Sequence, residues 1–255
     1  MNNIFDSHAH YDSSAFDDDR KELVSALPMR GVCGVINCAS DLESCETSLA
    51  LAEEYPFIYA ACGVHPEEIE KCGDEWLELL KKFCGHKKCA AVGEIGLDYH
   101  YEPETRDKQI EFFEKQIILA NELDLPVIVH DREAHEDTLT LLKKHRPKGV
   151  LHCFSGSAEM AKEVLKIGMY IGLGGAATFK NARKPIEVAA MVPEDRLLIE
   201  TDCPYMTPVP FRGHRNDSSL IPYTAQVLAE ARNTDAQSIL DQTRNNANTL
   251  FGTLL

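Results

Sequence analysis

The sequence is poor in positive charge relative to negative charge. Lysine and arginine number 26 against 41 acidic residues, which gives a formal net charge of −15. Such a surface repels nucleic acid and opposes a large footprint on duplex DNA. A pocket that binds a single strand end is still allowed, provided that bound metal ions supply positive charge locally.

Long apolar runs and closely spaced cysteine pairs are also absent. No apolar stretch approaches the ~18 residues that a membrane-spanning helix needs, and no basic segment followed by an apolar one marks an export signal. The nine cysteines are scattered without a C-x-x-C pair, which argues against a zinc ribbon or a thioredoxin-type site. We therefore expect free thiols and a cytoplasmic protein without membrane attachment.

What the sequence does contain is a repeating alternation of short apolar runs and longer amphipathic segments. The apolar runs are Ile4-Phe5, GVCGVINCA, FIYAACGVH, CAAVGEIGLD, LPVIVHD, KGVLHCFSG, GMYIGLGG and RLLIETD. Helical spacing of apolar residues follows in DLESCETSLALAEEY, ETRDKQIEFFEKQIILANELD, REAHEDTLTLLKKH and SAEMAKEVLKIG, and again in the tail DAQSILDQTRNNANTLFG. Asp41 is a candidate N-cap and Gly168 a candidate C-terminal stop.

Eight candidate strands that alternate with helices favour a parallel TIM (β/α)8 barrel over an open doubly wound sheet, which usually has five or six strands. No linker or low-complexity segment divides the chain, so we predict one domain over residues 1–255. The proline-rich loop CPYMTPVPFRGHRND follows the eighth strand directly and is interpreted as an active-site loop.

Polar side chains stand where the predicted strands end. His8 and His10, in the stretch DSHAH, are two residues apart, and a strand would place both imidazoles on one face. The later strand ends carry His65, Glu94, His130, His152, Glu200 and Asp202. In a barrel all these ends lie at the C-terminal face, where side chains from different strands converge.

A metal centre is the chemistry that this set predicts. Taken singly, each histidine could be a hydrogen-bonded structural residue and each acid an ion-pair partner or turn cap, but burying several carboxylates without partners is costly. The candidate ligands are His8, His10, Glu94, His130, His152 and Asp202. Four imidazoles and two carboxylates exceed what one tetrahedral zinc with an open position uses and suit two divalent ions, with Mg, Mn and Zn all possible.

The same residues lie in motifs that resemble the TatD family of metal-dependent deoxyribonucleases. The motifs occur in the order DSHAHYD, GVHP, AVGEIGLDYH, PVIVHDREAHEDTL, HCFSGS, IGLGGAATFKNAR, LLIETDCPYMTP, FRGHRND and NANTLFG. The similarity extends from Phe5 to Gly252. It implies a barrel of the amidohydrolase superfamily that cleaves DNA with bound metal, typically as a 3′-5′ exonuclease that prefers single strands.

The resemblance also implies how the ligands divide between the ions. His8, His10, Glu94 and Asp202 would hold one ion, and Glu94, His130 and His152 the other, with Glu94 in the bridging position that a carbamylated lysine occupies in many amidohydrolases. The chain departs from the family pattern after RGHRN, where DSSLIP replaces the usual Glu-Pro pair. This departure concerns the loop after the eighth strand, and the predicted ligand set is intact.

A hypothesis for catalysis follows from these assignments. The ions activate a water that attacks phosphorus, Asp202 accepts or relays its proton, and Glu94 bridges the ions. His65 contacts a phosphate or the leaving oxygen, or is instead a turn histidine before Pro66.

Substrate contacts are expected on the loops after the seventh and eighth strands. Arg212, His214, Arg215 and Asn216 would bind the DNA backbone, although solvated loop charges are an equal alternative. Tyr205 and Tyr99 would stack on a base or serve only in packing.

Lys180, Arg183 and Lys184 form the nearest approach to a basic patch. We expect the partner to be DNA, as single strands or 3′ ends.

Two rival functions use the same residues. Related barrels hydrolyse esters, amides or lactones, so an aminoacyl-tRNA ester is an alternative substrate for the same centre. A catalytically idle barrel that binds a partner is the other, and the complete ligand set argues against it.

Overall fold

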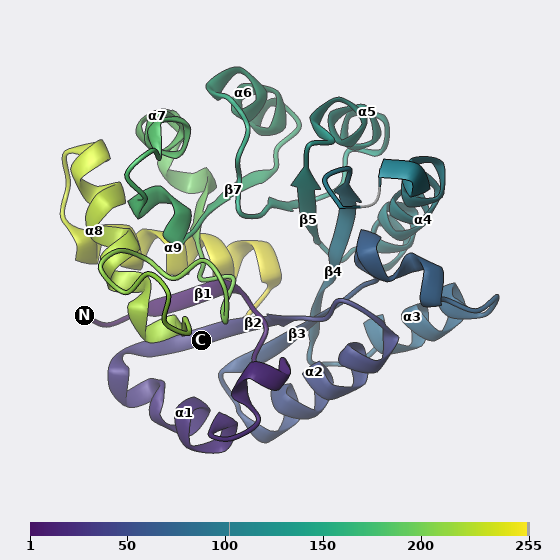
Figure 1. The fold of residues 1–255 in the computed structure, drawn as a ribbon, viewed down its shortest axis with the longest axis horizontal. Helices are drawn as coiled ribbons and strands as arrows, with labels where there is room; N and C mark the ends of the chain where they lie inside the picture. Colours follow the sequence, from purple (N-terminus) through teal and green to yellow (C-terminus); the bar gives the residue numbers. More distant parts are fainter. Residues whose placement is uncertain (102, 254–255) are drawn as a thin grey trace.

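Eight parallel strands form a barrel in the computed structural model, which describes residues 1–101 and 103–253. Each strand pairs with the next along the chain, from β1 to β8. Figure 1 labels β1 to β5 and β7. The strands are β1 (Ile4–Ala9), β2 (Val32–Cys38), β3 (Ile58–Cys62), β4 (Cys89–Asp98), β5 (Val127–Arg132), β6 (Gly149–Leu151), β7 (Tyr170–Leu173) and β8 (Leu197–Ile199). The prediction of a TIM barrel is confirmed.

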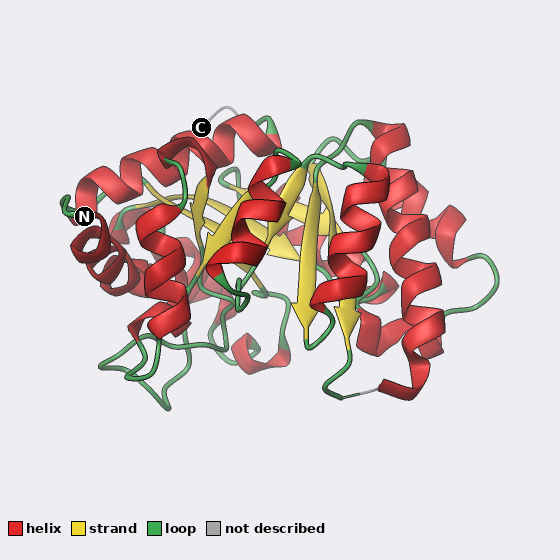
Figure 2. Cartoon of the chain, turned by 90° about the horizontal axis from the view of Figure 1, so that it is seen from above, coloured by secondary structure: helices red, strands yellow, loops and turns green. Residues whose placement is uncertain are grey.

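Helices surround the strands (Figure 2). Among the described residues they are α1 (Arg20–Ala26), α2 (Leu42–Glu54), α3 (Trp76–Cys84), α4 (Arg106–Leu123), α5 (His135–His145), α6 (Ala158–Lys166), α7 (Arg183–Met191), α8 (Ile221–Arg232) and α9 (Ala236–Phe251). The sequence analysis did not identify α1, α3, α7 or α8. No helix in the described part of the chain combines the length and apolar character that crossing a membrane requires.

Local capping explains where several predicted helices begin and end. The Asp41 side chain accepts a hydrogen bond from the Ser44 backbone N–H at 2.7 Å, and the Ser44 hydroxyl oxygen accepts from the Asp41 N–H, which forms a capping box at the start of α2. After α6, Gly168 adopts φ +90°, the left-handed conformation that suits glycine. Both predicted helix boundaries are confirmed.

The barrel interior is apolar at the end opposite the metal-ligand candidates. Buried side chains from successive strands, among them Phe5, Ile36, Ile128 and Leu198, pack with residues of α9. The Phe251 ring of α9 stacks on Phe5 with centroids 6.4 Å apart. Apolar side chains thus fill the barrel at the N-terminal ends of the strands, and the polar candidate ligands lie at the C-terminal ends.

The junction between β8 and β1 is held by loop residues and side chains. The two strands share no ladder, but the His10 N–H donates to the Cys203 carbonyl at 2.8 Å and the Asp202 N–H to the His8 carbonyl at 2.9 Å. The fully buried Asp6 carboxylate accepts from the backbone N–H and the hydroxyl of Thr201. These bonds fix Asp202 beside His8 of β1 and His10, which directly follows β1.

Candidate metal centre

Six side chains meet at the C-terminal ends of the strands. They are His8 of β1, His10 just after it, Glu94 of β4, His130 of β5, His152 directly after β6, and Asp202 after β8. His8, Glu94 and His152 are buried, while His10, His130 and Asp202 keep some exposed surface. The partly exposed members therefore form the side of the cluster that solvent reaches.

One half of the cluster has the dimensions of a tetrahedral site. Its four donor atoms are His8 Nε2, His10 Nε2, Glu94 Oε2 and Asp202 Oδ1. Five distances among these atoms lie between 3.0 and 3.6 Å. A tetrahedral ion about 2.1 Å from each ligand needs ligand atoms about 3.4 Å apart. These four atoms could therefore hold one divalent ion with little adjustment.

The other half uses the second oxygen of Glu94. Its Oε1 lies 2.7 Å from His152 Nε2 and 3.0 Å from His130 Nδ1. The rings of His8 and His152 stack with centroids 3.8 Å apart, so the two halves adjoin. One carboxylate thus presents a different oxygen to each pair of imidazoles.

In the first half, the imidazole nitrogens that point away from the cluster contact Cys38. His10 Nδ1 lies 2.8 Å from the Cys38 carbonyl, and His8 Nδ1 lies 3.4 Å from the Cys38 sulfur. Since a carbonyl only accepts, His10 carries its proton on Nδ1 and leaves Nε2 free as a ligand.

In the second half, the corresponding nitrogens face carboxylates. His130 Nε2 lies 3.0 Å from Asp98 Oδ2, and His152 Nδ1 lies 3.6 Å from Glu200 Oε1. Glu200 is buried, and Gly172 leaves room for its carboxylate, because a Cβ at residue 172 would lie 2.5 Å from Glu200 Oε2. Asp98 is within hydrogen-bond distance of His130 and can orient that ring and raise its basicity, whereas the Glu200 contact is longer than a hydrogen bond and acts on His152 through its charge.

Glu94 and His8 have the charge states that cation binding needs. Burial alone would raise the pKa of Glu94. The neighbouring His152, His8 and His65 outweigh burial and lower the pKa to well below its usual value. Glu94 is therefore ionised. Burial lowers the pKa of His8, which stays neutral as a metal ligand must be.

Burial alone would lower the pKa of His10, His130 and His152, but neighbouring carboxylates outweigh it and raise the pKa, so protons compete with metal at these three rings. His152 Nε2 is buried, and Glu94 Oε1 lies 2.7 Å from it, so the two groups face each other as ligands of a shared ion would. The donor set fits divalent metal.

His65 lies at the edge of the cluster with a different role. Its Nδ1 accepts the Glu67 backbone N–H at 3.3 Å, where His65 caps the 3-10 helix η3 (Pro66–Lys71). A neutral ring that accepts at Nδ1 carries its proton on Nε2. Burial lowers the pKa of His65 to about 3, so the ring is neutral. The Nε2–H, 3.6 Å from Glu94 Oε1, is thus a hydrogen-bond donor rather than a metal ligand.

The predicted substrate residues of the β8 loop are in varied environments. Tyr205 is 63% exposed. The Arg212 guanidinium lies 3.9 Å from the centroid of the Phe179 ring and donates to the Thr207 carbonyl, and His214 is exposed. All three have surface available for a ligand.

Two other residues of this loop are engaged within the protein. Arg215 pairs with Asp19 at 2.6 Å. Asn216 is fully buried, and its Nδ2 donates to the carbonyls of Thr201 and Tyr205. Asn216 therefore has no exposed surface with which to contact a phosphate, unlike the expectation from the sequence, and its amide holds the loop in shape.

The departure from the family pattern has a structural consequence at Ser218. This side chain replaces the usual proline and donates a 2.6 Å hydrogen bond to Asp6 Oδ2. Its backbone N–H donates to the Tyr11 hydroxyl, so the loop is tied to the first strand. The substitution adds a hydrogen bond that proline could not make.

The remaining sequence expectations concern the basic residues after β7 and Tyr99. Lys180, Arg183 and Lys184 are exposed, and Arg183 pairs with Glu187 at 2.9 Å. The Tyr99 hydroxyl donates a hydrogen bond to Asp137, so the polar end of this side chain is bound within the protein.

Asp98, Glu200 and Arg132 belong to the surroundings of the cluster but were not predicted as site residues. Asp98, Arg132 and Glu200 each lie an even number of positions from a candidate ligand near a strand end. Since side chains two positions apart on a strand share a face, this spacing could have indicated that they point toward the site. Their partners lie on other strands, which the sequence does not pair.

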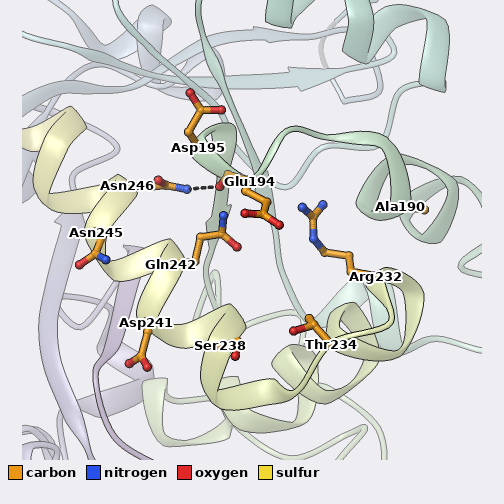
Figure 3. Close-up of a pocket in the computed structure, with 10 residues that line it drawn as sticks. All are labelled: Ala190, Glu194, Asp195, Arg232, Thr234, Ser238, Asp241, Gln242, Asn245 and Asn246. Carbon is orange, nitrogen blue, oxygen red and sulfur yellow. Dashed lines mark hydrogen bonds between the residues drawn. The ribbon is translucent and has the colours of Figure 1, made fainter.

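A polar hollow at the opposite end of the barrel is not part of this centre. It lies between α7, α8, α9 and the 3-10 helix η6 (Glu194–Arg196), which precedes β8 (Figure 3). Arg232 donates there to the Ala189 and Val192 carbonyls, and Asn246 donates to the Glu194 and Leu197 carbonyls. These side chains are already hydrogen-bonded to backbone carbonyls. None of the metal-ligand candidates lines the hollow.

Comparison with known proteins identifies the family of the chain. Residues 5–252 match the family model described as TatD related DNase. The chain is 43% identical over 251 residues to an uncharacterized metal-dependent hydrolase, YabD, of Bacillus subtilis, covering 97% of this chain and 98% of that one. It is 34% identical over 258 residues to a protein named 3′-5′ ssDNA/RNA exonuclease TatD of Cronobacter sakazakii, covering 97% of each.

A solved structure shows the same architecture. The crystal structure of the TatD homolog YjjV from Escherichia coli K12 superposes with a TM-score of 0.93 at 36% identity and covers 99% of both chains. With the family match, the relatives and the shared fold, the chain belongs to the TatD family of metal-dependent hydrolases.

Proposed function

We propose that this protein is a two-metal deoxyribonuclease that removes nucleotides from the 3′ ends of single-stranded DNA. The observation that carries the proposal is the position of Glu94, whose two oxygens face two separate sets of imidazoles. One carboxylate shared in this way is the arrangement that holds two divalent ions a few Å apart. When bound, the ions would activate a water and neutralise charge on the phosphate.

Asp202 is placed to accept a proton on the solvent side of the cluster. Its carboxylate is partly exposed, and Oδ1 lies 3.3 Å from His10 Nε2. The backbone bond from the Asp202 N–H to the His8 carbonyl fixes its position. A carboxylate held next to the nucleophile in this way can accept or relay its proton.

His65 is placed to donate a hydrogen bond. Because its proton is on Nε2, the ring can bind a phosphate oxygen or the leaving oxygen while remaining neutral. Catalysis is thus assigned to Asp202, Glu94 and His65.

Support for the substrate and polarity comes from a relative. The Cronobacter sakazakii protein is named a 3′-5′ ssDNA/RNA exonuclease and is 34% identical over nearly the whole chain. The acidic surface of this protein, at a net charge of −15, favours a substrate held at one end over a long duplex.

The experiment is digestion of single-stranded DNA by the purified protein. Strands labelled at the 5′ or at the 3′ end would be incubated with EDTA, Mg²⁺, Mn²⁺ or Zn²⁺, with the Glu94→Ala and His65→Gln variants in parallel. We expect metal-dependent, stepwise shortening of the 5′-labelled strand and early release of the 3′ label. Glu94→Ala should be inactive, and His65→Gln should lose activity while still binding metal.

Absence of cleavage with every metal, in a preparation that elemental analysis shows to hold two ions per chain, would overturn the nuclease assignment. The same preparations would then be tested on ester substrates, including an aminoacyl-tRNA.

A further inference from the structure

Arg132 stands one strand step beyond a candidate metal ligand. It is the last residue of β5, two positions after His130, so both side chains project from the same face about 7 Å apart along the strand. In the β4–β5 ladder it pairs with Asp98, the residue whose carboxylate contacts His130. Arg132 thus lies at the rim of the metal centre.

The charge of Arg132 is not neutralised by an ion pair. Within residues 1–101 and 103–253 no carboxylate lies within ion-pairing distance of it, whereas Arg106 and Arg215 each pair with an aspartate. Instead the guanidinium lies 4.5 Å from the centroid of the Tyr101 ring. Stacking on a ring leaves the edge donors of a guanidinium free to bind a phosphate.

Tyr101 offers an aromatic surface at the same place. Its side chain is 58% exposed, and the ring meets the His100 ring edge to face with centroids 4.8 Å apart. An exposed ring beside a cationic edge is the combination on which single-stranded nucleic acid is bound, through base stacking and phosphate contacts.

Asp98 fixes the position of Tyr101 relative to the candidate metal centre. Its Oδ1 accepts the backbone N–H groups of His100 at 2.9 Å and Tyr101 at 3.2 Å, while its Oδ2 faces His130 Nε2 at 3.0 Å. One buried carboxylate therefore fixes both the turn that carries Tyr101 and a candidate metal ligand.

We propose that Arg132 and Tyr101 form a nucleotide subsite next to the scissile bond. The guanidinium binds the phosphate of a flanking nucleotide, and the tyrosine ring stacks on its base. The proposal rests on the proposed function, since it names how the same centre holds a single strand. It also supplies a fixed positive charge at the rim of a centre rich in carboxylates, where phosphate would otherwise be repelled.

The test measures binding and turnover separately. Binding of a fluorescent oligothymidylate is followed by anisotropy in EDTA over a range of salt concentrations, and KM and kcat are measured with Mn²⁺ on a labelled single strand. The variants are Arg132→Gln, Arg132→Lys, Tyr101→Leu and Tyr101→Phe. Arg196→Gln is the matched control, because Arg196 also lies over a tyrosine ring, that of Tyr170 at 5.1 Å, but at the N-terminal end of the barrel.

We expect Arg132→Gln to raise Kd and KM about tenfold and to reduce the slope of log Kd against log salt by about 0.7, the loss of one phosphate contact with a single strand. Arg132→Lys should keep the slope because it keeps the charge. Tyr101→Leu should weaken binding at least about fivefold with the slope unchanged, and Tyr101→Phe should bind as the wild type does.

An Arg132→Gln protein with wild-type KM, Kd and salt slope would overturn the subsite, and so would an equal change in Arg196→Gln. If the wild type cleaves DNA while Arg132→Gln behaves identically, only the subsite fails. If the wild type neither binds nor cleaves DNA, the proposed function and the subsite fail together.

Discussion

The two halves of the candidate metal centre contain similar side chains but different surroundings. Behind His8 and His10 lies Cys38, which offers a carbonyl and a thiol. Behind His130 and His152 lie carboxylates, of Asp98 and Glu200. The first half contains a carboxylate besides Glu94, that of Asp202. In the second half Glu94 is the one carboxylate among the candidate ligands.

Negative charge would therefore reach the two halves by different routes. In the first half Asp202 would contact a bound ion directly, as a fourth ligand. In the second half the carboxylates of Asp98 and Glu200 would act through the imidazoles, whose basicity they raise. We therefore expect the half with four ligands to bind metal more tightly, and the other half to depend on its supporting carboxylates.

Removing the shared carboxylate should have the largest effect, because it disables both halves at once. Glu94→Ala should lower the rate of DNA hydrolysis by at least about a thousandfold and reduce metal content to below one ion per chain. Metal analysis and a digestion assay check this, with thermal unfolding to establish that the variant folds. A variant that retains two ions would contradict the shared role.

Removing one supporting carboxylate should separate the halves. Glu200→Gln keeps the shape of the side chain but loses its charge, so the second metal-binding step should weaken by about 10- to 100-fold while the first stays unchanged. Calorimetric titration of the metal-free protein measures both steps. Weakening of the first step alone would show that the pairing of ligands and supports is wrong.

A change behind the first half should have a smaller effect. Cys38→Ala removes the thiol near His8 but leaves the Cys38 carbonyl that holds His10, so we expect less than about a threefold change in the first binding step. The same titration measures it. A loss as large as that of Glu200→Gln would remove the contrast between the two halves.

The smallest effect is expected for a carboxylate–histidine pair outside the centre, which provides the reference. Glu114 of α4 contacts Lys144 and His145 of α5, and these neighbours lower its pKa. Because the pKa is lower in the folded protein, the stabilisation is present above the unfolded pKa and is lost as the pH falls through the folded one. Glu114→Gln should lower the free energy of unfolding at pH 7 by less than about 1 kcal/mol and flatten its dependence on acid pH. Chemical denaturation at several pH values measures this.

The sequence predicted the barrel and the ligand candidates because both follow from local patterns. The alternation of apolar runs and helices indicated eight strands, and residues such as Glu94, within β4, and His152, directly after β6, stand out as polar groups in apolar segments. Helices such as α7, which begins with Arg183-Lys184-Pro185, were missed because their charged starts hide the apolar spacing.

The supporting residues could not be predicted because their roles depend on contacts between distant parts of the chain. Asp98 acts through His130 of the next strand, and Glu200 through His152 at a separation of 48 positions. For the same reason Asn216 looked like a substrate contact in a loop rich in arginine, whereas the fold buries its amide against the backbone of that loop.

The most direct test of the two-ion centre is a titration of the metal-free protein with Mn²⁺, followed by electron paramagnetic resonance. We predict two binding steps, an isolated-ion spectrum at one equivalent, and a magnetically coupled pair at two, since ions that share Glu94 would lie a few Å apart. The coupling should be absent in Glu94→Ala. Binding of a single ion by the wild type, or of two ions without coupling, would contradict the account.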